Sequence, residues 1–306
     1  YLFLSAAIDT VKPGQTSGNF ANNYAKGFTA SFGWEGDKDA PIAWADGTYK
    51  LRANDDQTIT FGVTGLPAKS INWYNAEGYL PCFVSEYSKD GMDYKIENFA
   101  DMLVIDEKEY EVAYSRMTVV NNSEEIKLLP TVSSYLIPLN DAAKNVKAIE
   151  PGETVGRDNC IGVECGVYTY PADAVLAAQG SFDEHYAHMK EYWNNRLEKI
   201  VDIQSIPEKY EELINAYKAG YIYTLIIADG YELHVGENGY DRVFDHDVIG
   251  MLATLVESGH TEHFADYAQY ILQNIQYPDA AWKFSWPFAL YLQKTGDFDT
   301  VLSFME

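Results

Sequence analysis

The stretch SFDEHYAHMKEYWNNRLEKI, residues 181–200, marks a change in the hydrophobic period of the chain. Its apolar residues recur every three or four positions, which predicts one buried face of a helix. Ser181, followed three residues later by Glu184, has the arrangement of a capping box at a helix N-terminus. The residues of the apolar face are Phe182, Tyr186, Met189, Trp193, Leu197 and Ile200. We therefore expect a helix here that bridges two regions of different character.

Upstream of this helix, the sequence is typical of β-strands. Runs of β-branched and aromatic residues alternate with turn clusters such as NDD, KDG and PGE. We interpret YLFLSAAI (residues 1–8) as a further strand and residues 10–27 as a long loop. The clearest strand runs are TYKLRA (48–53), TITFGV (58–63), LPCFVSEY (80–87), MLVIDEKEYEVAYSRMTVV (102–120) and IKLLPTVSSYLIPL (126–139). Many strands without intervening helices predict an antiparallel β-sandwich over residues 1–175.

Downstream of the bridging helix, which we place at residues 181–203, the sequence is helical to its end. Caps or glycines separate successive amphipathic segments, beginning with a segment that starts near Pro207 and ends at Gly230. The later segments are residues 245–259, 261–275, 283–296 and 298–306. The fold class is therefore mixed, with a strand domain, a bridging helix and a helical domain over residues 204–306.

The charge of the chain limits its partners. A formal net charge of −24 on 306 residues argues against nucleic acid or an anionic membrane surface, because such partners need clustered lysine and arginine. No apolar stretch reaches the ~18–20 residues of a membrane span. A neutral ligand fits this charge, and 24 tyrosines and 6 tryptophans offer ring faces for sugars, although aromatic residues also fill cores. The sequence does not fix the compartment; an extracytoplasmic one is favoured.

A cluster of charged and aromatic residues lies in GENGYDRVFDHDVIGMLATL, residues 236–255, directly ahead of an apolar helical stretch. Asp245 and Asp247 are favoured at a helix start by the helix dipole, whatever the function. Tyr240, Arg242 and His246 are not needed for that role, although a solvated loop can hold them. We interpret these five residues as candidates for substrate binding, with helix capping and pairing among the charges as the alternative roles.

A second candidate group for substrate binding is Trp282, Lys283 and Trp286. Tryptophan faces stack on sugar rings through the apolar C–H patches of the sugar. Trp286 also has helical spacing to Ala289 and Leu290, so core packing is its alternative role. Trp282 precedes the helix and is the better candidate for a binding pocket.

Metal and cofactor sites are not indicated. Asp241, Asp245 and Asp247 could supply oxygens to calcium, but their spacing lacks the signature of a calcium loop. Two histidine pairs with i, i+3 spacing have no apparent third zinc ligand, and we expect them at the surface. These pairs are His185 with His188 and His260 with His263. Cys82, Cys160 and Cys165 also lack metal-ligand spacing, and we expect small buried side chains. We therefore expect no metal and no cofactor.

A β-sandwich, a bridging helix and then helical hairpins resemble the six-hairpin glycosidases with an N-terminal supersandwich. These are the bacterial glucoamylase-type hydrolases and, more distantly, the disaccharide phosphorylases. In that group an acidic motif at the start of the second toroid helix, often an Arg-Asp pair, contacts the terminal sugar. Here Asp247 falls on the aspartate, whereas His246 replaces the arginine. The stretch WKFSWPFALYLQKTGD, residues 282–297, resembles the fourth toroid helix of the group.

The resemblance implies a glycoside hydrolase that acts on a neutral oligosaccharide. A disaccharide phosphorylase and a carbohydrate-binding or assembly protein without catalysis are the alternatives. Glycoside hydrolysis needs two carboxyl groups that flank the scissile bond. Asp245 and Asp247 point to different sides of a helix start, which is a poor geometry for that task. We therefore assign no catalytic residue and expect the acid and the base beyond residue 306.

The resemblance also implies an (α/α)6 toroid, of which residues 204–306 would form only the first hairpins. We expect the remainder, as a continuation or as a second chain, to pack against the helical domain. Several apolar side chains of these helices are expected to need that closure in order to be buried. They are Leu252, Leu255, Ile271, Phe288 and Leu292.

Overall fold

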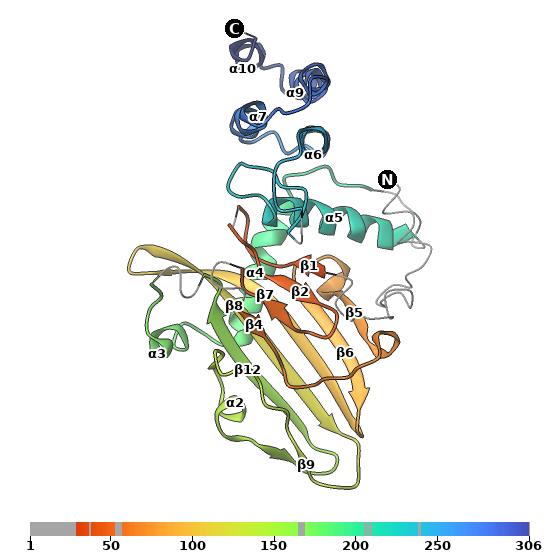
Figure 1. Ribbon diagram of the computed structural model, residues 1–306, viewed down its shortest axis with the longest axis vertical. Helices are drawn as coiled ribbons and strands as arrows, with labels where there is room; N and C mark the ends of the chain where they lie inside the picture. The colour runs from red at the N-terminus through yellow and green to blue at the C-terminus, as the bar shows by residue number, and fades with distance from the viewer. Residues whose placement is uncertain are drawn as a thin grey trace. The chain divides into compact units, whose positions relative to one another are not determined.

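The computed structural model of the chain (Figure 1) describes residues 29–36, 38–52, 57–164, 169–204, 207, 210–237 and 240–305. They belong to two compact units, Tyr1–Trp34 with Asp39–Glu191 and Glu35–Lys38 with Tyr192–Glu306. We call them the strand unit and the helical unit. Their contents confirm the predicted change from antiparallel strands to helices. The strand predicted at residues 1–8 and the loop predicted at residues 10–27 lie outside the described residues.

The strand unit holds two larger antiparallel sheets and one small one. The four-stranded sheet has the order β1 (Thr29–Ser31), β2 (Ile42–Trp44), β3 (Tyr49–Lys50), β4 (Thr58–Ile59). The six-stranded sheet has the order β10 (Ile137–Pro138), β12 (Thr154–Gly162), β8 (Lys108–Asn121), β7 (Met92–Ile105), β6 (Phe83–Lys89), β5 (Asn72–Asn75). The small sheet pairs β9 (Lys127–Leu128) with β11 (Ala148–Ile149). Short helices lie between strands at η2 (Ala68–Ser70), η3 (Ala76–Gly78) and α2 (Asp141–Asn145), and α3 (Asp173–Leu176) follows the last strand, β12.

The β7–β8 hairpin is the longest feature of the six-stranded sheet. Its register runs from Met92 opposite Asn121 to Ile105 opposite Lys108. Only two residues join the strands, and both have positive φ, Asp106 at 50° and Glu107 at 63°. Such φ values are those of a type I′ turn, whose twist matches that of the flanking strands. The sequence run at residues 102–120 is therefore a hairpin and not one strand.

The apolar core of the strand unit lies between its two larger sheets. Successive residues of a strand point to opposite faces, so alternate residues of β7 and β8 enter this core. Residues of the four-stranded sheet pack against residues of the six-stranded sheet in one buried cluster. Among its members are Tyr49, Ile59, Phe61, Ile96, Ala100, Met117 and Val119. The strand unit is thus a layered antiparallel β structure, as the sequence predicts at this coarse level.

Helix α4 (Phe182–Leu197) packs on the other face of the six-stranded sheet. The ring of Phe99, on β7, meets those of Phe182 and Tyr186 edge to face at 5.1 Å and 5.7 Å. The predicted capping box is confirmed, because the Ser181 N–H donates to the Glu184 carboxylate at 2.8 Å and the Glu184 N–H to the Ser181 hydroxyl at 3.3 Å. The start of α4 is therefore where the sequence predicts it, whereas the helix ends at Leu197 and not at residue 203.

The prediction that His185 and His188 lie at the surface is wrong for His185. Asp101, on β7, is almost fully buried and faces α4. Its carboxylate accepts from Nδ1 of His185 at 2.8 Å and from Nδ1 of His188 at 2.6 Å. His185 also stacks on Tyr114 at 4.1 Å between ring centroids. A buried carboxylate needs such donors, and the i, i+3 spacing lets one helix supply both.

The helical unit contains the predicted helices with modest shifts of their ends. They are α5 (Glu211–Ile226), α6 (Asp245–Glu257), α7 (Phe264–Gln273), α8 (Ala280–Lys283), α9 (Ser285–Thr295) and α10 (Phe298–Ser303). Helix α5 begins at Glu211 and not near Pro207. Gly296, with φ of 70°, ends α9 in the left-handed conformation that favours glycine. Helix α6 contacts α7, α8 and α9, which follow it in the chain; Figure 1 labels α6, α7 and α9.

The prediction that the apolar faces of these helices need further helices is wrong for four of the five residues named. Leu252, Leu255, Ile271 and Phe288 are buried in the chain as it stands. Leu292 is half-buried. Contacts between aromatic rings contribute to the burial of Phe288. The ring of Phe264 meets that of Phe288 edge to face at 5.1 Å and stacks on that of Tyr291 at 4.1 Å.

The short segment Glu35–Lys38 belongs to the helical unit through polar contacts. The Glu35 carboxylate accepts from the Arg196 guanidinium at 2.6 Å and from the Tyr192 hydroxyl at 2.7 Å. Arg196 also donates to Glu262 at 3.2 Å. The Gly36 N–H donates to the carbonyl of Leu225 at 2.9 Å. A segment distant in sequence is thereby fixed to this unit.

His260, which we expect at the surface from the sequence, is buried instead. Its Nδ1 lies 2.8 Å from the Tyr221 hydroxyl. Burial lowers the pKa of His260 from 6.5 to about 4, because an imidazolium cation would lose its hydration there. His263 remains half-exposed, as predicted, and stacks on Tyr231 at 4.7 Å.

We expect His260 to make the helical unit sensitive to acid. The folded chain keeps this imidazole neutral down to about pH 4, whereas the unfolded chain binds a proton near pH 6.5. Its contribution to stability is therefore complete above pH 6.5 and is lost as the pH falls toward 4. Between about pH 7.5 and about pH 4.5, wild type should lose about 2 kcal/mol more unfolding free energy than His260→Asn, measured by urea denaturation. If the two proteins lose equal amounts of unfolding free energy, burial does not lower the pKa of His260.

Two further predictions from the sequence concern the cysteines and the presence of membrane-spanning helices. Cys82 and Cys160 are buried, as expected, and Cys165 lies outside the described residues. None of the helices in the described ranges combines the length and the apolar character that crossing a membrane requires.

Candidate functional site

The start of helix α6 is built around Asp245, which is only 1% exposed. Its Oδ2 accepts from the backbone N–H groups of Gln276 and Tyr277, both at 2.8 Å, and its Oδ1 from that of His246 at 2.9 Å. Burial acts to raise the pKa of Asp245, but the three N–H donors outweigh it and hold the pKa below its ordinary value. This carboxylate therefore stays ionised and fixes the loop that follows α7 to the start of α6.

The fixed loop brings Asp279 beside two of the residues predicted for substrate binding. Asp279 Oδ1 lies 3.0 Å from Nε2 of His246, and its Oδ2 accepts from Nζ of Lys283 at 2.9 Å. Lys283 Nζ is also 3.4 Å from His246 Nε2. The hydrogen bond from Lys283 lowers the pKa of Asp279. His246, Asp279 and Lys283 form one polar cluster, which we call the His246 cluster.

Trp282 and Trp286 lie next to the His246 cluster on α8 and α9. Phe284 between these helices has the helical angles φ −61° and ψ −21°, so the two tryptophans are one turn apart on one face. Their exposed fractions are 68% and 55%. Lys283 Nζ lies 5.9 Å from the centre of the Trp282 ring, within reach of a cation–π contact. Trp286 is therefore exposed and does not pack in the core, which was its alternative role.

The remaining predicted residues lie on the segment before α6 or on its first turn. Tyr240 is exposed, and its ring is 5.8 Å from that of Phe244. The Arg242 guanidinium lies 5.2 Å from the Phe244 ring. Asp247 is exposed on the first turn of α6, where the helix dipole favours its charge. Among the contacts of the described residues, none of these three side chains forms a hydrogen bond, an ion pair or a ring contact with the His246 cluster.

Two residues that are not predicted from the sequence, Asp279 and Tyr277, belong to this region. Asp279 joins His246 to Lys283. Tyr277 is 51% exposed, and its ring lies 4.9 Å from that of His246 at an interplanar angle of 33°. The sequence carries one signal for Asp279, namely its i, i+4 spacing to Lys283. No comparable signal indicates Tyr277, because its place depends on the backbone contacts of Asp245.

A second polar cluster in the helical unit surrounds His234. Its Nδ1 lies 2.7 Å from Asp241, and its Nε2 lies 3.2 Å from Glu232 and 3.9 Å from Asp229. Asp241 is thus engaged with His234 rather than with Asp245 or Asp247. Within the residues that the structure describes, no group of three His, Cys, Asp or Glu side chains is arranged to hold a metal ion.

The site thus combines a buried clamp, a polar cluster and exposed rings. Asp245 accepts hydrogen bonds from backbone N–H groups. The His246 cluster presents a histidine, a carboxylate and an amine, and the two tryptophans present apolar ring faces. This arrangement can bind a ligand that has both hydroxyl groups and an apolar face. Comparisons of the chain with protein-family models, with curated proteins and with solved structures find no match.

Proposed function

We propose that the helical unit binds a neutral oligosaccharide through Trp282, Trp286 and the His246 cluster, and that this binding serves the cleavage of a glycosidic bond. The observation that carries the binding proposal is the exposure of the two tryptophans on one helical face. Two neighbouring exposed tryptophans form an apolar patch, and covering such a patch with the face of a ligand is favourable. Two rings one helical turn apart are spaced for successive rings of one oligosaccharide.

The polar cluster supports a neutral ligand over a charged one. Asp279 and Lys283 offset each other's charge, and His246 adds a donor or an acceptor. Sugar hydroxyl groups can donate to the carboxylate and accept from the amine, so both signs are useful. An anionic substrate would meet the net charge of −24 on the whole chain.

The enzymatic part of the proposal rests on the resemblance to six-hairpin glycosidases. Asp245 and Asp279 both have protein partners, so we assign them to positioning and to binding. We assign the general acid and base to no described residue. Incubating the protein with maltopentaose, cellopentaose and xylopentaose, with and without phosphate, separates the activities. Free sugar supports a hydrolase, sugar phosphate indicates a phosphorylase, and binding without either product indicates a carbohydrate-binding protein.

The double change Trp282→Ala and Trp286→Ala tests the binding surface. Loss of two stacking contacts, at about 0.5–1.5 kcal/mol each, should lower the association constant for the oligosaccharide bound best about 10-fold or more. Isothermal titration calorimetry with the same three pentasaccharides measures this.

The matched control is Phe298→Ala, since Phe298 is also an aromatic residue of the helical unit that is more than half exposed. It lies on α10, outside the proposed surface. Affinity that survives the double change, or falls equally with Phe298→Ala, would contradict the proposed surface.

A further inference from the structure

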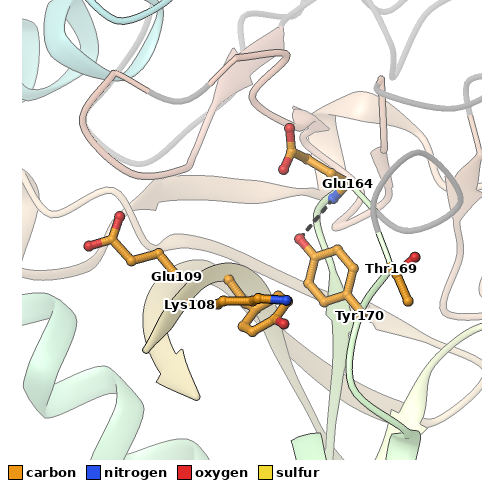
Figure 2. Close-up of a pocket in the computed structure, with 6 residues that line it drawn as sticks. Lys108, Glu109, Glu164, Thr169 and Tyr170 are labelled. Atoms are coloured by element: carbon orange, nitrogen blue, oxygen red, sulfur yellow. Dashed lines mark hydrogen bonds between the residues drawn. The ribbon is translucent and has the colours of Figure 1, made fainter. Parts of the chain in front are cut away.

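A hollow of about 510 Å³ lies at the end of the β7–β8 hairpin in the strand unit (Figure 2). This volume is within the range of ~300–1,000 Å³ that small-molecule sites occupy. We call it the Tyr110 hollow. The residues that line it are Lys108, Glu109, Tyr110, Glu164, Thr169 and Tyr170. None of these residues belongs to the site in the helical unit.

One wall of the hollow, Tyr170, is held rigidly. Its hydroxyl donates to the carbonyl oxygen of Glu111 at 2.7 Å and accepts from the N–H of Glu164 at 3.2 Å, the bond drawn in Figure 2. Its ring lies over Gly162, where an added Cβ would be only 2.5 Å from Cε1. Glycine therefore makes room for the ring. A side chain fixed in this way loses little entropy when a ligand binds to it.

A second ring completes an aromatic corner. Tyr110, the third residue of β8, lies 5.5 Å from Tyr170 between ring centroids, with an interplanar angle of 49°. Both tyrosines are half-buried, so each keeps part of its surface accessible. Two inclined rings offer an apolar surface on which the C–H face of a sugar can pack.

Polar groups surround this aromatic corner. Lys108 and Glu109 are exposed and line the hollow. Figure 2 shows the Lys108 amine directed toward the side on which Tyr170 lies. Thr169 adds an exposed hydroxyl group. An ammonium group, carboxylates and a hydroxyl can together satisfy the donors and acceptors of a polyhydroxylated ligand, and the mixed signs favour one without net charge.

We propose that the Tyr110 hollow is a second site for a neutral sugar unit, located in the strand unit. Tyr110 and Tyr170 supply the stacking surface, and Lys108 donates to hydroxyl groups of the ligand. The inference goes beyond the proposed function because it concerns other residues and can hold even if the helical unit binds no sugar. Two sites on one chain would let it hold two parts of one polysaccharide or two separate molecules.

The test uses the full chain with Trp282→Ala and Trp286→Ala, which removes the proposed surface of the helical unit. This background is titrated with maltopentaose, cellopentaose and xylopentaose by nuclear magnetic resonance, with saturation transfer to detect weak binding. It should still bind at least one of them. Adding Tyr110→Ala should lower the remaining association constant about 10-fold, whereas Tyr110→Phe, which keeps the ring, should change it less than about 3-fold.

Lys108→Ala provides a second test that does not depend on a core change, since the Lys108 side chain is exposed. It should weaken the remaining binding several-fold with an unchanged melting temperature. Remaining binding that is unaffected by Tyr110→Ala and by Lys108→Ala would overturn the inference. Complete loss of binding in the tryptophan background would also overturn it, while leaving the proposed function intact. If wild type binds none of the three sugars, both proposals fail.

Discussion

Replacing Arg116 with alanine should lower the unfolding free energy by about 3–5 kcal/mol, because it leaves the buried carboxylate of Asp158 without its cation. The guanidinium donates to both oxygens of Asp158, at 2.7 Å and 2.9 Å, across the pair β8 and β12. It also lies 4.1 Å from the centre of the Phe182 ring, at the start of α4. Urea denaturation of wild type and Arg116→Ala, monitored by circular dichroism, measures the loss.

The control for this change is Asp183→Asn. Asp183 also accepts from Arg116, at 2.7 Å, but its side chain is 75% exposed. Water screens an exposed pair, so this change should cost less than about 1 kcal/mol. A cost of Arg116→Ala no larger than that of Asp183→Asn would show that Asp158 finds other partners when the arginine is removed.

Replacing Gly62 with alanine should lower the unfolding free energy by about 2–5 kcal/mol, from backbone strain and a collision together. Gly62 has φ of 74°, a left-handed conformation that side chains with a Cβ disfavour. An added Cβ would lie 2.9 Å from the amide nitrogen of Thr131 and closer still to its carbonyl oxygen. These are backbone atoms, so relieving the contact requires the chain at Thr131 to move away from the core.

Gly152→Ala separates the two causes. Gly152 has nearly the same φ, 76°, but an added Cβ there would meet no atom within 4 Å. This change should cost only the conformational part, about 1–2 kcal/mol. The two variants are compared in the same urea titration. If Gly62→Ala and Gly152→Ala lower the unfolding free energy equally, the segments at Gly62 and Thr131 can move apart without a loss of stability.

Helices were the features most predictable from the sequence, because their signals are local. The capping box of Ser181 and Glu184 places the start of α4, and Gly296 places the end of α9. The strand region was predictable as a class but not in detail. The turn at Asp106 and Glu107 uses two acidic residues with positive φ, where asparagine or glycine is the usual signal.

Buried polar contacts were not predictable, since they depend on residues far apart in the chain. His185 meets Asp101 across 84 positions, and no local pattern indicates that a histidine of α4 faces a carboxylate on β7. The burial of His260 likewise depends on packing around it. Histidine spacing alone therefore led to the wrong expectation of surface pairs.

The candidate site was predictable in part. His246 and Lys283 are 37 positions apart and both are predicted from the sequence, and in the structure their side chains lie 3.4 Å apart. Asp279, which joins them, was not predicted, because its position follows from the hydrogen bonds of Asp245 to Gln276 and Tyr277. A loop fixed by backbone contacts leaves little trace in the types of its own residues.

The two-residue turn of the β7–β8 hairpin bears on the order in which the sheet can assemble during synthesis. Strands β5, β6 and β7 each pair with the next strand along the chain, so each of these three pairings closes only a short loop. Short loops close quickly and at small entropic cost. The centre of the sheet can therefore form while the chain beyond Asn121 is still being made, and β12 adds to an edge that already exists. During synthesis, strands β5 to β8 would leave the ribosome first and could form a sheet, and β12 would then pair with the free edge of β8.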